Sequence, residues 1–156
     1  MSKTKLPRDI QQQCLWIVRG YERNKRDYNE RRREIIDSGS AHYTEYRAAN
    51  GEERRAFLPG SHTASRTTED KMMQLEGLEH TQAYKQMEAV EHALDRVGAG
   101  LPDMMRSDLK KAIRNNIENG KKYPFDRLYI VGISRRGFYR YRESFLWDIA
   151  NELGLL

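Results

Sequence analysis

The sequence predicts an all-α protein with a long N-terminal helix, a polar loop, a helical core and a C-terminal helix-turn-helix. Three observations favour this fold class. Apolar residues recur at three- and four-residue spacing along most of the chain. Glycine and proline gather in residues 38–66 and at a few helix ends. The one β-rich run, residues 128–131, has no partner strand elsewhere.

Length and composition limit the kinds of protein that this sequence can encode. The 156 residues suit one domain, or one domain with an arm. No apolar run approaches the roughly 20 residues of a membrane span, and the first residues do not form the apolar segment of a signal peptide. A single cysteine, Cys14, excludes an intrachain disulfide and falls on an apolar helical stripe, so we expect a small buried hydrophobe. These features predict a cytoplasmic protein.

The net charge of +5 conceals a marked segregation. Residues 1–33 hold ten Lys or Arg against four Asp or Glu, and residues 106–142 hold eleven against three. Residues 67–105 hold three against eight. Two basic surfaces are therefore expected, while the acidic centre is most simply a solvated helix face.

Residues 1–37 are predicted to form one long amphipathic helix that begins at Pro7. Cys14, Tyr21, Tyr28 and Ile35 advance by seven residues, the spacing of a narrow apolar seam. Such a seam packs along another helix of the same chain or forms a coiled coil with a second copy. Both arrangements fit, and the second implies a homodimer through helix 7–37.

Residues 38–66 are predicted to be a flexible loop, and residues 67–156 a helical domain. Thr67 and Asp70 resemble a capping box at the start of a helix that runs to about Val97. The predicted buried stripe of that helix is Met73, Ala83, Met87, Val90, Leu94 and Val97. A third helix opens at Pro102 and closes at Gly120. Its predicted stripe is Met105, Leu109, Ile113 and Ile117.

A helix-turn-helix is predicted over residues 124–153. Its first helix would be the short apolar element that follows Pro124, and Gly132 would make the turn. A strand at residues 128–131 is the competing local interpretation, rejected for want of a partner. The second helix has an apolar face made of Phe138, Tyr141, Phe145, Ile149 and Leu153.

The start of this second helix carries the strongest functional signal. Ser134 is a suitable N-cap, and cations crowd the two turns behind it. An apolar-backed helix with arginines near its N-terminus is typical of a recognition helix in a DNA major groove. The alternative is an ordinary solvated basic helix. The predicted DNA-binding residues are Ser134, Arg135, Arg136, Tyr139, Arg140 and Arg142, with Lys121 and Lys122 as flanking contacts.

Within this set the expected roles differ. Arg135, Arg136 and Tyr139 are candidates for base edges, whereas Arg140 and Arg142 would contact phosphates. Gly137 is unusual inside a helix, and we hypothesise that it permits close approach to the DNA backbone. Lys110, Lys111 and Arg114, on the outer side of the third helix, would add positioning contacts.

No catalytic constellation is recognisable. The chain has no glycine-rich phosphate loop, no Cys/His ligand spacing and no nucleophile elbow, and His80 and His92 stand alone. We expect no enzymatic activity, no cofactor and no metal.

The segment 132–142, followed by Ile149-Ala150-Asn151-Glu152-Leu153-Gly154, resembles the C-terminus of phage late-gene transcriptional activators of the RinA/ArpU type. That region is similar to the promoter-binding helix-turn-helix of sigma factor region 4. The resemblance implies a prophage-encoded activator in a bacterial host cell that binds double-stranded promoter DNA and engages host RNA polymerase. Gly137 stands where the family often has Thr or Ser. Two rival hypotheses are a small terminase-like DNA-packaging component and a coiled-coil adaptor that does not bind DNA.

Overall fold

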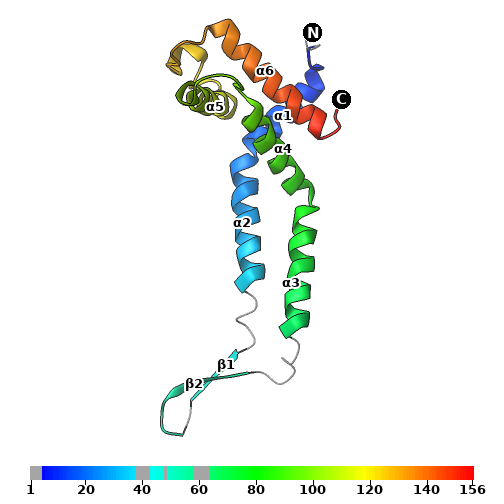
Figure 1. Cartoon of the computed structure of the whole chain (residues 1–156), viewed down its shortest axis with the longest axis vertical. Coiled ribbons are helices and arrows are strands. Elements are labelled where there is room, and N and C mark those ends of the chain that lie inside the picture. The colour runs from blue at the N-terminus through cyan, green and yellow to red at the C-terminus, as the bar shows by residue number, and fades with distance from the viewer. Residues whose placement is uncertain (1–4, 38–42, 48, 58–63) are drawn as a thin grey trace. The chain divides into compact units, whose positions relative to one another are not determined.

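The computed structural model describes residues 5–37, 43–47, 49–57 and 64–156. Figure 1 labels the elements in chain order. They are the helices α1 (Arg8–Arg19), α2 (Tyr21–Asp37), α3 (Ala64–Glu79), α4 (Gln82–Arg96), α5 (Asp103–Glu118) and α6 (Arg135–Glu152), the strands β1 (Tyr43–Arg47) and β2 (Glu53–Phe57), and the 3-10 turn η2 (Phe125–Arg127). The fold class is all-α, as predicted, with one small hairpin added.

The chain divides into two compact units, of which the first is made of two separate segments of the sequence. The first joins the described residues up to Asn24 with Lys85–Leu156, and the second is Lys25–Tyr84. In the first unit α1 packs on both α5 and α6, and α5 packs on α6. The two ends of the sequence therefore build one helical core.

The core of the first unit consists largely of the apolar stripes that spacing predicts. Leu109, Ile113, Phe138, Phe145 and Ile149 are fully buried. Tyr141, Leu153 and Met105, from the same predicted stripes, are half-buried at the rim. Burial of this kind contributes roughly 25 cal/mol for each Å² of apolar surface removed from water.

The predicted helix over residues 7–37 is wrong in its continuity, because Gly20 separates α1 from α2. Glycine in a helix interior costs about 1 kcal/mol relative to alanine, which makes it a weak point. The first part of the predicted seam is occupied within the chain, since Cys14 of α1 is fully buried and Tyr21 of α2 nearly so, and the neighbouring Val18 is also fully buried. These seam residues are therefore not open to a second copy. Burial also raises the pKa of the Cys14 thiol to about 11, as suits a small hydrophobe.

The predicted helix over residues 67–97 is likewise two helices, and the first begins earlier, at Ala64. Thr81 makes the break. Its hydroxyl accepts a hydrogen bond from the Tyr84 amide at 3.3 Å and donates to the Leu78 carbonyl at 2.8 Å. Such local bonding competes with a continuous helix.

The predicted buried stripe of this helix is only partly buried in the structure. Met87, Val90 and Val97 are buried, Leu94 is half-buried, and Met73 and Ala83 are exposed.

Within the second unit, two contacts join distant parts of the sequence. The Tyr28 and Tyr84 rings lie 5.0 Å apart, centroid to centroid. The Lys71 ammonium donates to the Ile36 carbonyl at 3.0 Å, which ties α3 to the end of α2.

The prediction that residues 38–66 form a loop is also corrected. β1 and β2 pair antiparallel, with Tyr43 opposite Phe57 and Arg47 opposite Glu53. The turn contains Asn50 and Gly51, and Gly51 adopts a φ of 84°. Asn-Gly between extended segments favours a hairpin because the turn needs a positive φ. Residues 38–42, 48 and 58–63 of the predicted loop lie outside the described residues.

The predicted helix-turn-helix over residues 124–153 is corrected at its first helix. The segment after Pro124 makes only the three-residue turn η2 and then an irregular stretch, neither helix nor strand. Tyr129 takes a φ of 50°, and Tyr129 and Val131 are 86% and 85% exposed. These side chains are too exposed to anchor a scaffold helix. The helix that precedes and contacts α6 is α5, with residues 119–134 between them.

Candidate nucleic-acid interface

The entry into α6 is built as the sequence predicts. Gly132 has a φ of 83°, and a Cβ at this position would lie 2.7 Å from Met105 Cε. The positive φ of the turn therefore favours glycine, and any other residue would also have to displace the flexible end of the Met105 side chain. The Ser134 hydroxyl then accepts a hydrogen bond from the Gly137 amide at 3.1 Å, which caps the helix.

The same cap offers a reason for Gly137. A Cβ there would lie 3.2 Å from Ser134 Oγ and 3.6 Å from Ile133 Cγ2. The first distance is tighter than an ordinary van der Waals contact, so an added side chain would crowd the capping oxygen. Glycine at this position thus favours the cap, in addition to any role in approaching DNA.

Phe138 fixes the orientation of the first turns of α6. It is fully buried, and its ring lies 5.5 Å from Phe125 of η2 and 5.3 Å from the edge-on ring of Tyr139. With Phe138 directed into the core, Arg135, Arg136 and Arg140 are exposed, and Tyr139 is 37% exposed. Four of the predicted residues therefore share the solvent side of the first turns of α6.

The charges of these arginines are not neutralised by any acidic side chain among the described residues. Arg135, Arg136 and Arg140 form no ion pair with another described residue. The first turn of α6 contains no acidic residue. Cations at a helix N-terminus face the positive end of the helix dipole, which is unfavourable unless an anion binds. We define these residues, Arg135, Arg136, Tyr139 and Arg140, as the α6 basic face.

Arg142 differs from this face. It is half-buried, and its Nε atom is buried without a hydrogen-bond partner among the described residues. Burial lowers the pKa of the Arg142 guanidinium, and the nearby positive charge of Arg19 lowers it further. Arg142 is therefore poorly placed for the simple surface contact with a phosphate that the sequence predicts.

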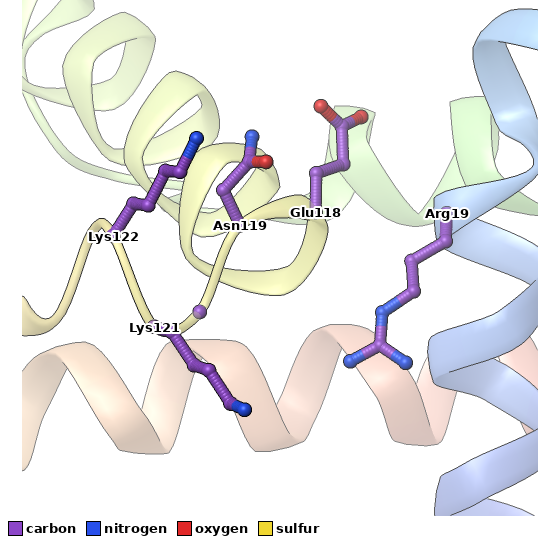
Figure 2. A pocket seen from close by; sticks show the side chains of 6 residues that line it. Arg19, Glu118, Asn119, Lys121 and Lys122 are labelled. Atoms are coloured by element: carbon purple, nitrogen blue, oxygen red, sulfur yellow. The ribbon is translucent and has the colours of Figure 1, made fainter.

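Lys121 and Lys122 are exposed on a well-defined turn after α5. The buried Asn116 side chain donates to the Tyr123 carbonyl at 3.0 Å, and the Lys122 amide donates to the Asn119 carbonyl at 2.9 Å. These bonds hold the turn against the end of α5. The turn and Arg19 of α1 border an open hollow of about 420 Å³, whose side chains Figure 2 shows.

Two of the three predicted cations of α5, Lys110 and Arg114, lie near acidic side chains. Arg114 bonds to Glu22, lies 3.4 Å from Glu118 and stacks over the Tyr21 ring at 5.0 Å. Lys110 lies 4.0 Å from Asp95, and Lys111 is exposed. Arg114 therefore joins residues of α2 and α5 within the first unit, and a contact between Arg114 and DNA stays a prediction.

Two further arginines that bond to backbone carbonyls were not predicted. Arg19 lies inside the predicted N-terminal helix and is not among the predicted binding residues. Its Nε donates to the Ile117 carbonyl at 3.1 Å. Arg106 donates from Nε to the Val97 carbonyl at 2.8 Å and from Nη2 to the Asp95 carbonyl, closing the end of α4. The only sequence feature that indicates a role for Arg19 is its place as a basic residue in the last turn of α1. No feature of the neighbouring sequence indicates the hydrogen bonds of Arg106.

Among the described residues no three His, Cys, Asp or Glu side chains cluster as metal ligands, and no helix there is long and apolar enough to cross a membrane. His92 is exposed, and it bonds to Glu152 of α6 rather than standing alone. Comparison with known proteins finds no matching family model, curated protein or solved structure.

Proposed function

We propose that this chain is a sequence-specific DNA-binding transcriptional activator of phage late genes, which reads promoter DNA with α6 and engages host RNA polymerase. The observation that carries the proposal is the α6 basic face. Three arginines without an ion-pair partner in the described part of the chain, together with a tyrosine, project from the first turns of a capped helix whose other side is buried. The major groove, about 12 Å wide, admits a helix in this orientation.

The proposed division of labour follows from position along α6. Arg135 and Arg136 lie at the tip, where a helix entering the groove end-on meets base edges, and arginine pairs well with guanine O6 and N7. Arg140 lies further back and would contact phosphate, as would Lys121 and Lys122. The late-gene and polymerase parts of the proposal come from the resemblance of residues 132–142 to RinA/ArpU-type activators.

Packing of α1 weakens the coiled-coil adaptor hypothesis. An adaptor through helix 7–37 would use the seam that Cys14 and Val18 occupy inside the chain's own core. A small terminase-like packaging component would require a ring of subunits, so the number of subunits in solution separates it from the proposed activator.

The test is a titration of labelled fragments from the gene's own neighbourhood at two salt concentrations. We expect one preferred fragment, and we expect the Arg135→Ala/Arg136→Ala variant to lose that preference. Loss of one good arginine–guanine pair costs about 1–3 kcal/mol, or roughly 5- to 150-fold in affinity. Binding without any preferred fragment would contradict sequence recognition by α6.

The matched control is Arg31→Ala/Arg32→Ala. These two arginines are also adjacent, exposed and on a helix, but they belong to α2. The control removes the same net charge and should keep the preference. Equal losses from both variants would mean that charge alone, and not α6, determines binding.

Activation is tested separately with purified bacterial RNA polymerase and the preferred fragment. The expected result is more transcript when the protein is present and no increase with Arg135→Ala/Arg136→Ala. DNA binding with no effect on transcription, from a ring-shaped oligomer, would favour the packaging component.

A further inference from the structure

The hollow beside α6 brings together parts of the chain that are far apart in sequence. It is lined by Arg19 from the end of α1 and by Glu118, Asn119, Gly120, Lys121 and Lys122 from the end of α5 and the turn after it. All belong to the same compact unit. The hollow measures about 420 Å³ and is open to solvent, so it suits part of a large ligand lying on the surface.

Its charge is predominantly positive. Arg19, Lys121 and Lys122 contribute three cations against one acid, Glu118. The Glu118 carboxylate is 3.4 Å from Arg114, which neutralises much of its charge. Arg19, Lys121 and Lys122 have no ion-pair partner in the described part of the chain.

The geometry orients two of these cations towards one place. Arg19 Nε is held by the Ile117 carbonyl at 3.1 Å, which leaves the two terminal nitrogens for another partner. In Figure 2 the Lys121 ammonium and the Arg19 guanidinium extend to the same side of the hollow, whereas Lys122 extends away. A planar guanidinium and an ammonium facing one space are complementary to a phosphate.

A third positive charge lies close by. Arg142 of α6 has a half-buried side chain whose Nε has no hydrogen-bond partner among the described residues, and its interaction with Arg19 is repulsive. An anion bound beside Arg19 would offset this repulsion between like charges. Arg142 adds to the field of the hollow rather than reaching the anion itself.

We propose that Arg19 and Lys121 together hold one backbone phosphate of the DNA that α6 binds. This inference rests on the proposed function and extends it to a residue of the N-terminal helix. The pair would fix the position of α6 on the duplex without reading sequence, because phosphate contacts carry no base information. α1 thereby contributes to DNA binding as well as to the core.

The experiment measures log K for a duplex against log[salt] for Arg19→Gln, Lys121→Gln and the double variant. Each phosphate neutralised contributes a slope of about −0.9 for double-stranded DNA. One shared phosphate predicts that the double variant loses about 0.9 of slope. A loss of about 1.8 would mean two separate phosphates, and no loss would mean no contact; either result overturns the proposal. The preferred fragment should stay the same.

Two controls separate binding from folding. Arg8→Gln removes an exposed cation at the other end of α1 and should leave the slope unchanged. Arg19→Lys keeps the charge but loses the guanidinium that bonds to Ile117, so it should retain most of the slope. If Arg19→Lys behaves like Arg19→Gln and both melt at lower temperature, Arg19 has only a structural role and the proposal is wrong.

The failure of this inference is distinguishable from failure of the proposed function. Wild-type protein without salt-dependent DNA affinity would refute both. An unchanged slope in Arg19→Gln/Lys121→Gln, with fragment preference still dependent on Arg135 and Arg136, refutes only the shared phosphate site. A final experiment is a titration with inorganic phosphate. Tight binding of the free ion, together with an unchanged slope of log K for DNA against log[salt] in the variants, would assign the hollow to a small anion instead.

Discussion

The arginines of α5 and those at the start of α6 lie in similarly basic stretches of sequence but differ in their contacts. Arg106 and Arg114 bind carbonyls, carboxylates and a tyrosine ring of their own unit. Arg135, Arg136 and Arg140 are exposed and form no ion pair with a described residue. Basic charge along a sequence therefore does not identify an anion-binding surface; what identifies it is which cations the fold leaves without an acidic partner.

The largest expected effect is a difference in stability between variants at two neighbouring positions of α6, one buried and one exposed. Phe138→Ala removes a fully buried ring and should lower the free energy of unfolding by about 3–5 kcal/mol. Tyr139→Ala, on the exposed side, should change stability much less and DNA affinity more. Urea titrations and fragment binding measure both quantities. A similar loss of stability in the two variants would show that Tyr139 belongs to the core.

Replacement of an arginine that bonds within its own unit should lower stability and leave DNA affinity unchanged. Arg106→Met keeps the apolar stem but loses the bonds to the Val97 and Asp95 carbonyls. Hydrogen bonds from a charged group contribute about 1.5–3 kcal/mol, so we expect a loss of about 2 kcal/mol in urea unfolding. Arg135→Met is the matched variant on α6, and it should leave stability unchanged. A weakened salt dependence in Arg106→Met would contradict the assigned role.

The helix cap predicts a smaller effect that depends on a second residue. Ser134→Ala should cost about 1 kcal/mol, because the Gly137 amide loses its acceptor. Gly137→Ala by itself gains helix propensity but crowds Ser134 Oγ. In the Ser134→Ala background that crowding is gone, so Gly137→Ala should then stabilise by up to about 1 kcal/mol.

This double-mutant cycle also tests the earlier hypothesis for Gly137. If glycine is needed only for the cap, Gly137→Ala in either background leaves the DNA affinity unchanged. A loss of affinity in a variant that is no less stable would support close approach of this turn to DNA.

The smallest expected effect is a pH dependence of stability. The hydrogen bond to Glu152 raises the pKa of His92, with burial opposing and the charges of Glu152 and Glu88 adding to the rise. A folded pKa above the unfolded value of about 6.5 means that the contribution is complete below pH 6.5 or so and is lost as pH rises through the folded value. For this exposed pair we expect less than about 1 kcal/mol. Unfolding measured at several pH values should lose this slope in His92→Gln, and an unchanged slope would exclude the pair as its source.

The sequence predicts what depends on neighbours within one or two turns. The apolar face with Phe138, Phe145 and Ile149, the turn at Gly132 and the cap at Ser134 are all correct, because period and backbone angle determine them. The breaks at Gly20 and Thr81 were missed because periodicity continues across them. The β1–β2 hairpin had a local signal, Asn50-Gly51, which was interpreted only as part of a loop.

The partners of the arginines could not be predicted in this way. Arg114 meets Glu22 across most of the sequence, and Arg106 reaches carbonyls at the end of the preceding helix. Arg19 lies beside the turn of Lys121 only because α1 packs on α5 and α6. Such pairings follow from tertiary packing, which hydrophobic period alone does not specify.

Packing of α1 against α5 and α6 also bears on how the protein is made. The ribosome produces Cys14, Leu15 and Val18 long before α6, one of the two helices on which α1 packs. The second unit, Lys25–Tyr84, can begin to form in between. The surface proposed to bind DNA therefore assembles only after α6 has emerged, so a nascent or truncated chain that lacks either end has no complete binding unit.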